Sequence, residues 1–426
     1  MYNKTIFDNG LILLTYQMKQ VHSASVGIWI KVGSRYETEH LSGISHLLEH
    51  MVFKGSRKYD KDSIKQNIEG KGGSLNGFTA EELTCYLAKV PKENIFSSLD
   101  ILFDMYTHPL LKEEDLLREK TVIIEEIKMY KDLPQHIVQE QLDLLMWPNH
   151  QLGRNIAGTV ETVSNIDIIS LKSFHNKYYV PNNSVVVIAG AVEHKSCERF
   201  LKKIIKKHEF SKARFDFEVF NNKQKEIRIK ETKKEIEQTH LAIGFNSYSY
   251  RHPRRFIVNL LAIILGGNMS SRLFDKIRER YGLAYEISAQ CKYFFETGAF
   301  YIHAGLDNKK IELAINLIMK ELNKLKRIAV GQAELKRAKE FYLGQLAISL
   351  DDTLDHMIFL GNSFCNLGKQ IDFNFIKKQI DSITPNDLLE VSREIFHDKN
   401  INLSLVGPIN NFDREEVIRN IFRYLG

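Results

Sequence analysis

An internal repeat constrains the fold of this chain more than any other feature of its sequence. The strand-like segment 26–28 recurs as 243–245, and the helix-and-strand segment 167–190 recurs as 384–407. Both matches lie at the same offset of 217 residues. Two distant matches at one spacing indicate a duplicated domain.

The length and composition agree with two folded domains. A chain of 426 residues is long enough for two hydrophobic cores. We predict an N-terminal domain at 1–215, a linker at 216–232 and a C-terminal domain at 233–426. The linker region is rich in Lys, Glu and Asn and has no core periodicity. A hydrophobic fraction of 43% with 26% charged residues is typical of a folded soluble protein.

The charge, hydropathy and cysteine content of the sequence indicate its partners and its compartment. The formal net charge of +6 is small for this length, and basic residues alternate with acidic ones, which favours a solvated surface over a nucleic-acid-binding one. No run is long and apolar enough for a membrane span or a secretory leader. The four cysteines form no C-x-x-C pair and indicate free thiols: Cys85, Cys197, Cys291 and Cys365. We therefore expect a cytoplasmic protein that binds neither nucleic acid nor membrane.

A possible metal site lies in the amphipathic segment 43–53. In a helix, His46 and His50 are one turn apart on the same face, where two imidazoles can bind one metal ion. Glu49 borders that face and can act as a general base toward water. The order H-x-x-E-H is the inverted form of a zinc-hydrolase signature. The five residues alone also allow a solvated polar edge of a helix.

A later helix, predicted at 112–131, supplies candidate carboxylates. Glu119 and Glu126 are seven residues apart and lie on nearly the same helix face. Glu125 competes with Glu126 on sequence alone. At the repeat offset, the two histidine positions are occupied by Ile263 and Gly267, and this predicts one metal site per chain.

A glycine-rich segment at 71–79 precedes a predicted strand at 83–90. Its glycines allow either the close approach of another chain or a simple turn.

With these features in this order, the chain resembles peptidase family M16. These are the inverzincins of the pitrilysin and mitochondrial-processing-peptidase type, and the chain is most similar to the short bacterial members. The resemblance covers nearly the whole chain. It implies an α+β fold of the LuxS/MPP-like metallohydrolase type. The two homologous domains, each a mainly antiparallel sheet covered by helices, would form a clam-shell around a chamber.

The resemblance also implies the roles of individual residues. It implies one zinc ion per chain with three ligands, His46, His50 and Glu126. The family's third ligand follows the second histidine by about 76 positions, which matches Glu126. The pairing of Glu119 with Glu126 on one helix face favours Glu126 over Glu125. Glu49 matches the general base, and Glu119 matches a glutamate that supports activity without binding the metal.

Two further sets of residues match substrate-binding parts of the family. Asn76 and the strand after it match an edge strand that holds the substrate backbone, so we assign Asn76, Gly77 and Phe78 to substrate binding. Arg278 and Tyr285 match a pair from the C-terminal domain that contacts the substrate, and the tyrosine can donate to the oxyanion. Without the resemblance, they would read as a surface arginine and a packed tyrosine.

The function implied is zinc-dependent endopeptidase activity on peptides or unfolded segments inside a closed chamber. Because one chain supplies a single pair of domains, we expect a homodimer. The principal alternative is a non-catalytic core or scaffold subunit that binds peptides. Such relatives typically lack one or more metal ligands, whereas this chain has them all. A metal hydrolase acting on another substrate class is the third alternative.

Overall fold

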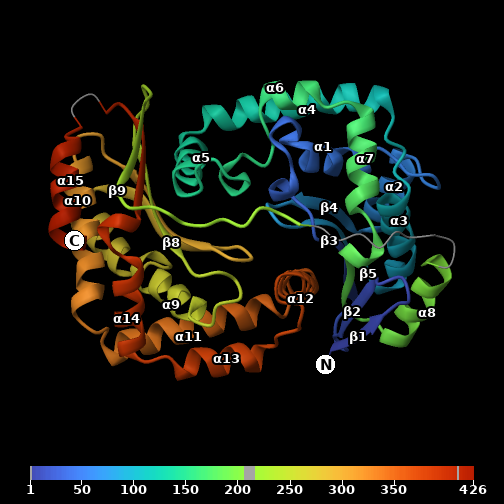
Figure 1. Ribbon diagram of the computed structural model, residues 1–426. Helices are drawn as coiled ribbons and strands as arrows, with labels where there is room; N and C mark the ends of the chain where they lie inside the picture. Colours follow the sequence, from blue (N-terminus) through green and yellow to red (C-terminus); the bar gives the residue numbers. More distant parts are fainter. Residues whose placement is uncertain (1, 206–215, 410–411) are drawn as a thin grey trace. The chain divides into compact units, whose positions relative to one another are not determined.

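The computed structural model describes residues 2–205, 216–409 and 412–426 (Figure 1). The chain divides into two compact units, each drawn from three separate segments. The first unit consists of Met1–Lys128, Arg154–Glu218 and Ala347–Ile371, and the second of Met129–Gly153, Val219–Leu346 and Asp372–Gly426.

The first unit is built on a six-stranded sheet in the order β1-β2-β6-β3-β5-β4. Its strands are β1 (Tyr2–Ile6), β2 (Ile12–Gln17), β3 (Ser23–Ile30), β4 (Ser74–Thr79), β5 (Thr84–Pro91) and β6 (Ser184–Gly190). Neighbouring strands are antiparallel except β2 and β6, which are parallel. A hairpin turn that contains Asn9-Gly10 joins β1 to β2, and β4 lies at one edge of the sheet.

Helices cover both faces of this sheet. They are α1 (Ile44–Val52), α2 (Lys61–Ile68), α3 (Ile95–Thr107), α4 (Glu113–Asp132), α6 (Val160–Asn165), α7 (Ile168–Tyr178), α8 (His194–Ile205) and α12 (Thr353–Leu367). Side chains alternate along each strand, so Ile28 of β3 packs in the core that contains α1, α3 and α7, whereas Trp29 packs against α12.

The second unit contains a five-stranded sheet in the order β7-β11-β8-β10-β9. Its strands are β7 (Arg228–Lys233), β8 (Thr239–Ser247), β9 (Ala284–Tyr293), β10 (Gly298–Leu306) and β11 (Ile401–Gly407). Only the pair of β7 and β11 is parallel among these described strands. Both sheets are therefore mainly antiparallel, and the predicted α+β class is confirmed.

The helices of the second unit are α5 (Pro134–Met146), α9 (Arg255–Gly266), α10 (Ile311–Arg327), α11 (Gln332–Ser349), α13 (Phe373–Ser382), α14 (Pro385–Ile395) and α15 (Arg414–Leu425). A π-helical segment, η7 (Phe274–Arg280), precedes β9. The repeat is visible element by element, since α7 and α14, and β6 and β11, are each separated by 217 residues.

One helix of each sequence half packs on the sheet of the other half. Helix α5 packs on β8 and β11, and α12 packs on β3 and β6. The repeated glycines lie under these helices. A Cβ added to Gly27 would lie 2.5 Å from Sδ of Met357 in α12, and one added to Gly244 would lie 2.5 Å from Sδ of Met146 in α5. Both glycines therefore leave room for an exchanged helix.

The structure departs from the predicted domain ranges in two places. The ranges 1–215 and 233–426 do not allow for the exchange of α5 and α12. The predicted linker 216–232 contains most of β7, a strand with partly exposed side chains and so no clear core periodicity. Residues 206–215 lie outside the described ranges.

Two remaining observations concern the cysteines and possible membrane spans. The four cysteines form no disulfide. Across the described part of the chain, no helix combines the length and apolar character that crossing a membrane requires.

Candidate metal centre

Helix α1 is fixed by burial on one side and by a carboxylate at its start. Its apolar face is fully buried and comprises Ile44, Leu47, Leu48, Met51 and Val52. Each such side chain contributes about 1.5–3 kcal/mol to folding. The residue before the helix, Gly43, has φ = 95° and lies against the backbone of Ala157, so a side chain there would be strained.

The carboxylate at the start of α1 belongs to Glu37. It accepts hydrogen bonds from the backbone N–H groups of Gly43 and Ser45, each at 2.8 Å. These are two of the donors that a helix start leaves without an intrahelical partner. Burial raises the pKa of Glu37 to about 7, although the two backbone donors act in the opposite direction.

The structure brings His46, His50 and Glu126 together. The Nε2 atoms of both histidines lie 3.9 Å from Oε2 of Glu126. All three potential ligand atoms lie within 4.8 Å of one another, and no second group of this kind occurs among the described residues. The histidines come from α1 and the glutamate from α4. Glu125, the sequence alternative, instead forms an exposed ion pair with Lys128 at 2.8 Å.

Glu119 lies behind His50, one step away from the ligand cluster. Its Oε2 is 3.1 Å from Nδ1 of His50, and its Oε1 is 2.7 Å from Nζ of Lys54. With the proton on Nδ1, the imidazole donates to Glu119 and leaves Nε2 free to bind a metal. Burial raises the pKa of Glu119, but the hydrogen bonds from His50 and Lys54 outweigh it and hold this pKa below its usual value.

Glu49 lies between the histidines and the edge strand. Its Oε2 accepts a hydrogen bond from Oγ1 of Thr79 in β4 at 2.6 Å. Burial raises the pKa of the Glu49 carboxyl, and the bond from Thr79 opposes this rise. A raised pKa makes the carboxylate a stronger base.

The three residues fit a zinc ion. Two imidazoles and one carboxylate are a common ligand set in catalytic zinc sites. Burial, followed by the nearby His50, lowers the pKa of His46 to about 4, so its ring is neutral at pH 7 and able to bind metal. The separations of 3.9 Å are close to the about 3.4 Å between ligand atoms of tetrahedral zinc.

The segment assigned to substrate binding forms the edge strand itself. Asn76, Gly77 and Phe78 lie within β4, at the end of the sheet. The sequence placed the edge at the strand after Asn76, but that strand is β5, which lies between β3 and β4. A Cβ added to Gly77 would lie 3.0 Å from the Phe53 ring and 3.3 Å from Oε1 of Glu49. Glycine thus lets the edge strand approach α1 closely.

Arg278 and Tyr285 belong to the second unit. Arg278 lies on η7 and Tyr285 near the start of β9. The guanidinium carbon of Arg278 is 5.2 Å from the centre of the Tyr285 ring, and the tyrosine is 75% exposed. The structure therefore places these two side chains beside each other in the second unit.

Sequence reasoning missed three residues that position the cluster: Glu37, Lys54 and Thr79. Lys54 follows His50 by one helical turn, so its spacing could have suggested proximity. Thr79 ends the glycine-rich segment, but only the packing of β4 beside α1 brings it to Glu49. No sequence pattern indicated a role for Glu37, because this residue lies in a loop before α1.

The fold and the site together define the class of an M16-type peptidase. The family "Insulinase (Peptidase family M16)" matches residues 13–160, and "Peptidase M16 inactive domain" matches residues 165–342. A Bacillus subtilis protein named "Uncharacterized zinc protease YmxG" is 34% identical, covering 95% of this chain and 98% of the relative. The chain belongs to peptidase family M16.

Solved structures show the same fold. A protease from Helicobacter pylori has a TM-score of 0.91 at 23% identity, covering 95% of this chain and 99% of that one. A peptidase M16 inactive domain from Pseudomonas fluorescens has a TM-score of 0.87 at 18% identity, covering 96% and 98%. At these identities, the likeness concerns the fold alone.

Proposed function

We propose that this protein is a zinc-dependent endopeptidase. The observation that carries the proposal is the convergence of His46, His50 and Glu126, with Glu49 beside them and an edge strand next to Glu49. The B. subtilis relative's name, a zinc protease, supports the choice of metal. We assign one zinc ion per chain to these three ligands.

When bound, zinc supplies a Lewis acid that polarises the scissile carbonyl and lowers the pKa of water. Glu49 takes a proton from the attacking water and passes it to the leaving amine nitrogen. Thr79 holds the Glu49 carboxylate in place, and Glu119 fixes the ring orientation of His50.

The free edge of β4 is suited to hold a peptide in extended form. An added strand would pair with the backbone of Asn76, Gly77 and Phe78 and therefore bind with little regard to sequence. We assign Arg278 and Tyr285 to substrate contact and to stabilisation of the oxyanion, as the family resemblance implies. Peptides or unfolded segments, held in a closed chamber, are the proposed substrates.

The decisive test is Glu49→Gln. The variant should keep its zinc in elemental analysis but lose about 10²–10⁴-fold in turnover of a peptide library, because the general base is gone. Glu125→Gln serves as the control, since that side chain is exposed and pairs with Lys128. Turnover at the wild-type rate in the Glu49 variant would contradict the assignment of Glu49 as the general base.

The alternative is a peptide-binding scaffold subunit, a role that the fold also allows because the P. fluorescens neighbour is named as an inactive domain. The complete set of metal ligands, His46, His50 and Glu126, favours the enzyme over the scaffold subunit. A scaffold would bind peptides without cleaving them, and chelation would leave that binding unchanged.

The homodimer and the cytoplasmic location stay predictions. Light scattering of an active preparation at micromolar concentration tests the first, and a monomer would contradict it. Cell fractionation tests the second.

A further inference from the structure

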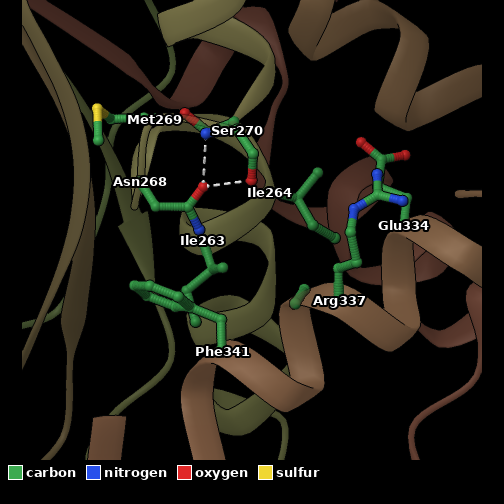
Figure 2. A pocket seen from close by; sticks show the side chains of 10 residues that line it. Ile263, Ile264, Asn268, Met269, Ser270, Glu334, Arg337 and Phe341 are labelled. Carbon is green, nitrogen blue, oxygen red and sulfur yellow. Dashed lines mark hydrogen bonds between the residues drawn. The ribbon is translucent and has the colours of Figure 1, made fainter. Parts of the chain in front are cut away.

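A pocket in the second unit lies beside Ile263, the residue that the repeat aligns with His46. It has a volume of about 380 Å³ and is formed by α9, the loop after it and α11 (Figure 2). At the offset of 217 residues, α11 corresponds to α4, the end of α9 corresponds to the start of α1, and Ile263 takes the position of His46. The residues aligned with His50 and Glu126, Gly267 and Leu343, do not line it, so the pocket is a different hollow between the two helices.

One side of this hollow is apolar. Its side chains are Ile263, Ile264, Met269, Ala338 and Phe341. Met269 is 77% exposed, so a ligand can cover its side chain and remove it from water. Covering apolar surface is favourable by about 25 cal/mol per Å². The lining therefore favours a ligand with an apolar group.

The other side carries a cation that is not neutralised by a partner. Arg337 lines the pocket, and within the described ranges no carboxylate forms an ion pair with it. The nearby Glu334 is bound in bidentate fashion by Arg272, with distances of 2.8 and 2.7 Å. Arg272, Glu334 and Arg337 together carry a net charge of +1. A guanidinium in this position is suited to bind a carboxylate through two hydrogen bonds.

A buried hydroxyl adds a second polar group. Ser271 lines the pocket, is 3% exposed, and its Oγ has no hydrogen-bond partner in the described part of the protein. Its neighbour Ser270 is already engaged, because its N–H and Oγ–H both donate to Oδ1 of Asn268 (Figure 2). An unpaired buried hydroxyl is costly, and a ligand oxygen would satisfy it.

We propose that this pocket binds the free α-carboxylate of a peptide that ends in an apolar residue. The carboxylate would accept hydrogen bonds from Arg337 and Ser271, and the apolar side chain would pack on Ile263 and Phe341. The inference rests on the proposed function, since hydrolysis of peptide bonds releases such carboxylates. The volume lies within the range of about 300–1,000 Å³ that small-molecule sites occupy.

The test is calorimetric titration of the full-length protein, as purified, with N-acetyl-L-phenylalanine. Arg337→Gln should weaken binding roughly tenfold or more, because the charge-assisted bonds are lost. Lys336→Gln is the matched control, since it removes the same charge from the adjacent residue, which does not line the pocket. It should change affinity less than about twofold. Equal affinity of wild type and the Arg337 variant would overturn the proposal.

Three further ligands separate the sources of the interaction. N-acetyl-L-phenylalaninamide lacks the charge and should bind roughly tenfold more weakly. The α-amide of N-acetyl-L-glutamic acid has a side-chain carboxylate without the apolar group and should also bind weakly. Inorganic phosphate should not compete. Equal binding of the amide, of the glutamate ligand or of phosphate would contradict a site for an apolar C-terminus.

This test is separate from the test of catalysis. Binding that depends on Arg337 in a protein that cleaves no peptide would leave the pocket assigned and refute only the peptidase. Peptide cleavage without such binding would refute only the pocket. Carboxylate binding at the metal centre would not respond to Arg337→Gln.

Discussion

Helices α1 and α9 occupy the same place in the repeat but carry different chemistry. Where α1 has His46 and His50, the second half has Ile263 in α9 and Gly267 directly after that helix. Both helices bury an apolar face in their unit, so the fold requires only that face. The side chains on the remaining face are free to differ, and one unit carries the candidate metal ligands while the other has a pocket.

The starts of the two helices differ as well. Glu37 binds the first N–H groups of α1, whereas its counterpart at the repeat offset is Arg254, which pairs with Glu394 on the surface. A fixed helix start matters where catalytic groups must be held within fractions of an ångström. The comparison therefore predicts that substitutions in the first unit affect function more than their counterparts in the second.

The largest effect should follow from removing the ligand on α4. Glu126→Gln should lose its zinc and reduce peptide hydrolysis by at least about three orders of magnitude, because the ion is no longer held. Glu125→Gln, one residue away, should retain both. Metal analysis and turnover are measured on the two variants side by side. Zinc retained in the first and lost in the second would reverse the ligand assignment.

The next effect concerns the start of α1 and depends on pH. The pKa of Glu37 in the folded protein, about 7, lies above its ordinary value of 4.5. Its favourable contribution to stability is therefore present below pH 4.5 and is lost as the pH rises through about 7.

Between pH 4.5 and about pH 7, the free energy of unfolding of the wild type should therefore fall by about 3 kcal/mol relative to that of Glu37→Gln. Urea unfolding at several pH values measures it. Arg254→Gln should change stability by at most about 1 kcal/mol, since its partners are exposed. A difference that does not vary with pH would contradict this account of Glu37.

A smaller effect is expected at Glu119. Glu119→Gln should lower zinc affinity by about 10- to 100-fold, because it orients His50 without binding the ion. The counterpart substitution, Lys336→Gln in α11, should leave zinc affinity unchanged. Titration with a competing chelator gives both values. Equal affinities would mean that His50 is oriented by the fold alone.

The smallest effects concern helix glycines. A Cβ on Gly361 of α12 would lie 2.1 Å from the rigid indole of Trp29, whereas one on Gly344 of α11 meets nothing within 4 Å. Gly361→Ala should destabilise the protein by about 1–3 kcal/mol through overpacking. Gly344→Ala should stabilise it by about 0.5–1 kcal/mol through helix propensity. Thermal unfolding distinguishes the two, and equal melting temperatures would contradict the packing of α12.

Much of the fold could be predicted because the repeat is regular. The offset that matched Gly190 to Gly407 also relates α7 to α14 in the structure. The exchange of α5 and α12 could not be predicted, because an apolar helix face shows that a helix is buried but not which sheet covers it. Likewise, the pairing of Arg228–Lys233 with β11 depends on residues far away in the chain.

For the site, helical spacing brought out His46, His50 and Glu49, since residues one turn apart share a face. Glu125 competed with Glu126 on sequence alone, and the pairing of Glu119 with Glu126 on one helix face favoured Glu126. The structure separates them physically, since only Glu126 points toward the imidazoles. The roles of Glu37 and Thr79 depend on contacts between elements, which no local pattern encodes.

The exchanged helix α12 has a consequence for synthesis of the protein. The face of the first sheet that holds Leu14 and Trp29 is covered by Met357, Leu360 and Phe364. These residues leave the ribosome after more than 320 further residues have followed Trp29. The nascent first unit therefore exposes an apolar sheet face for most of its translation, and we expect chaperones to bind it until α12 emerges.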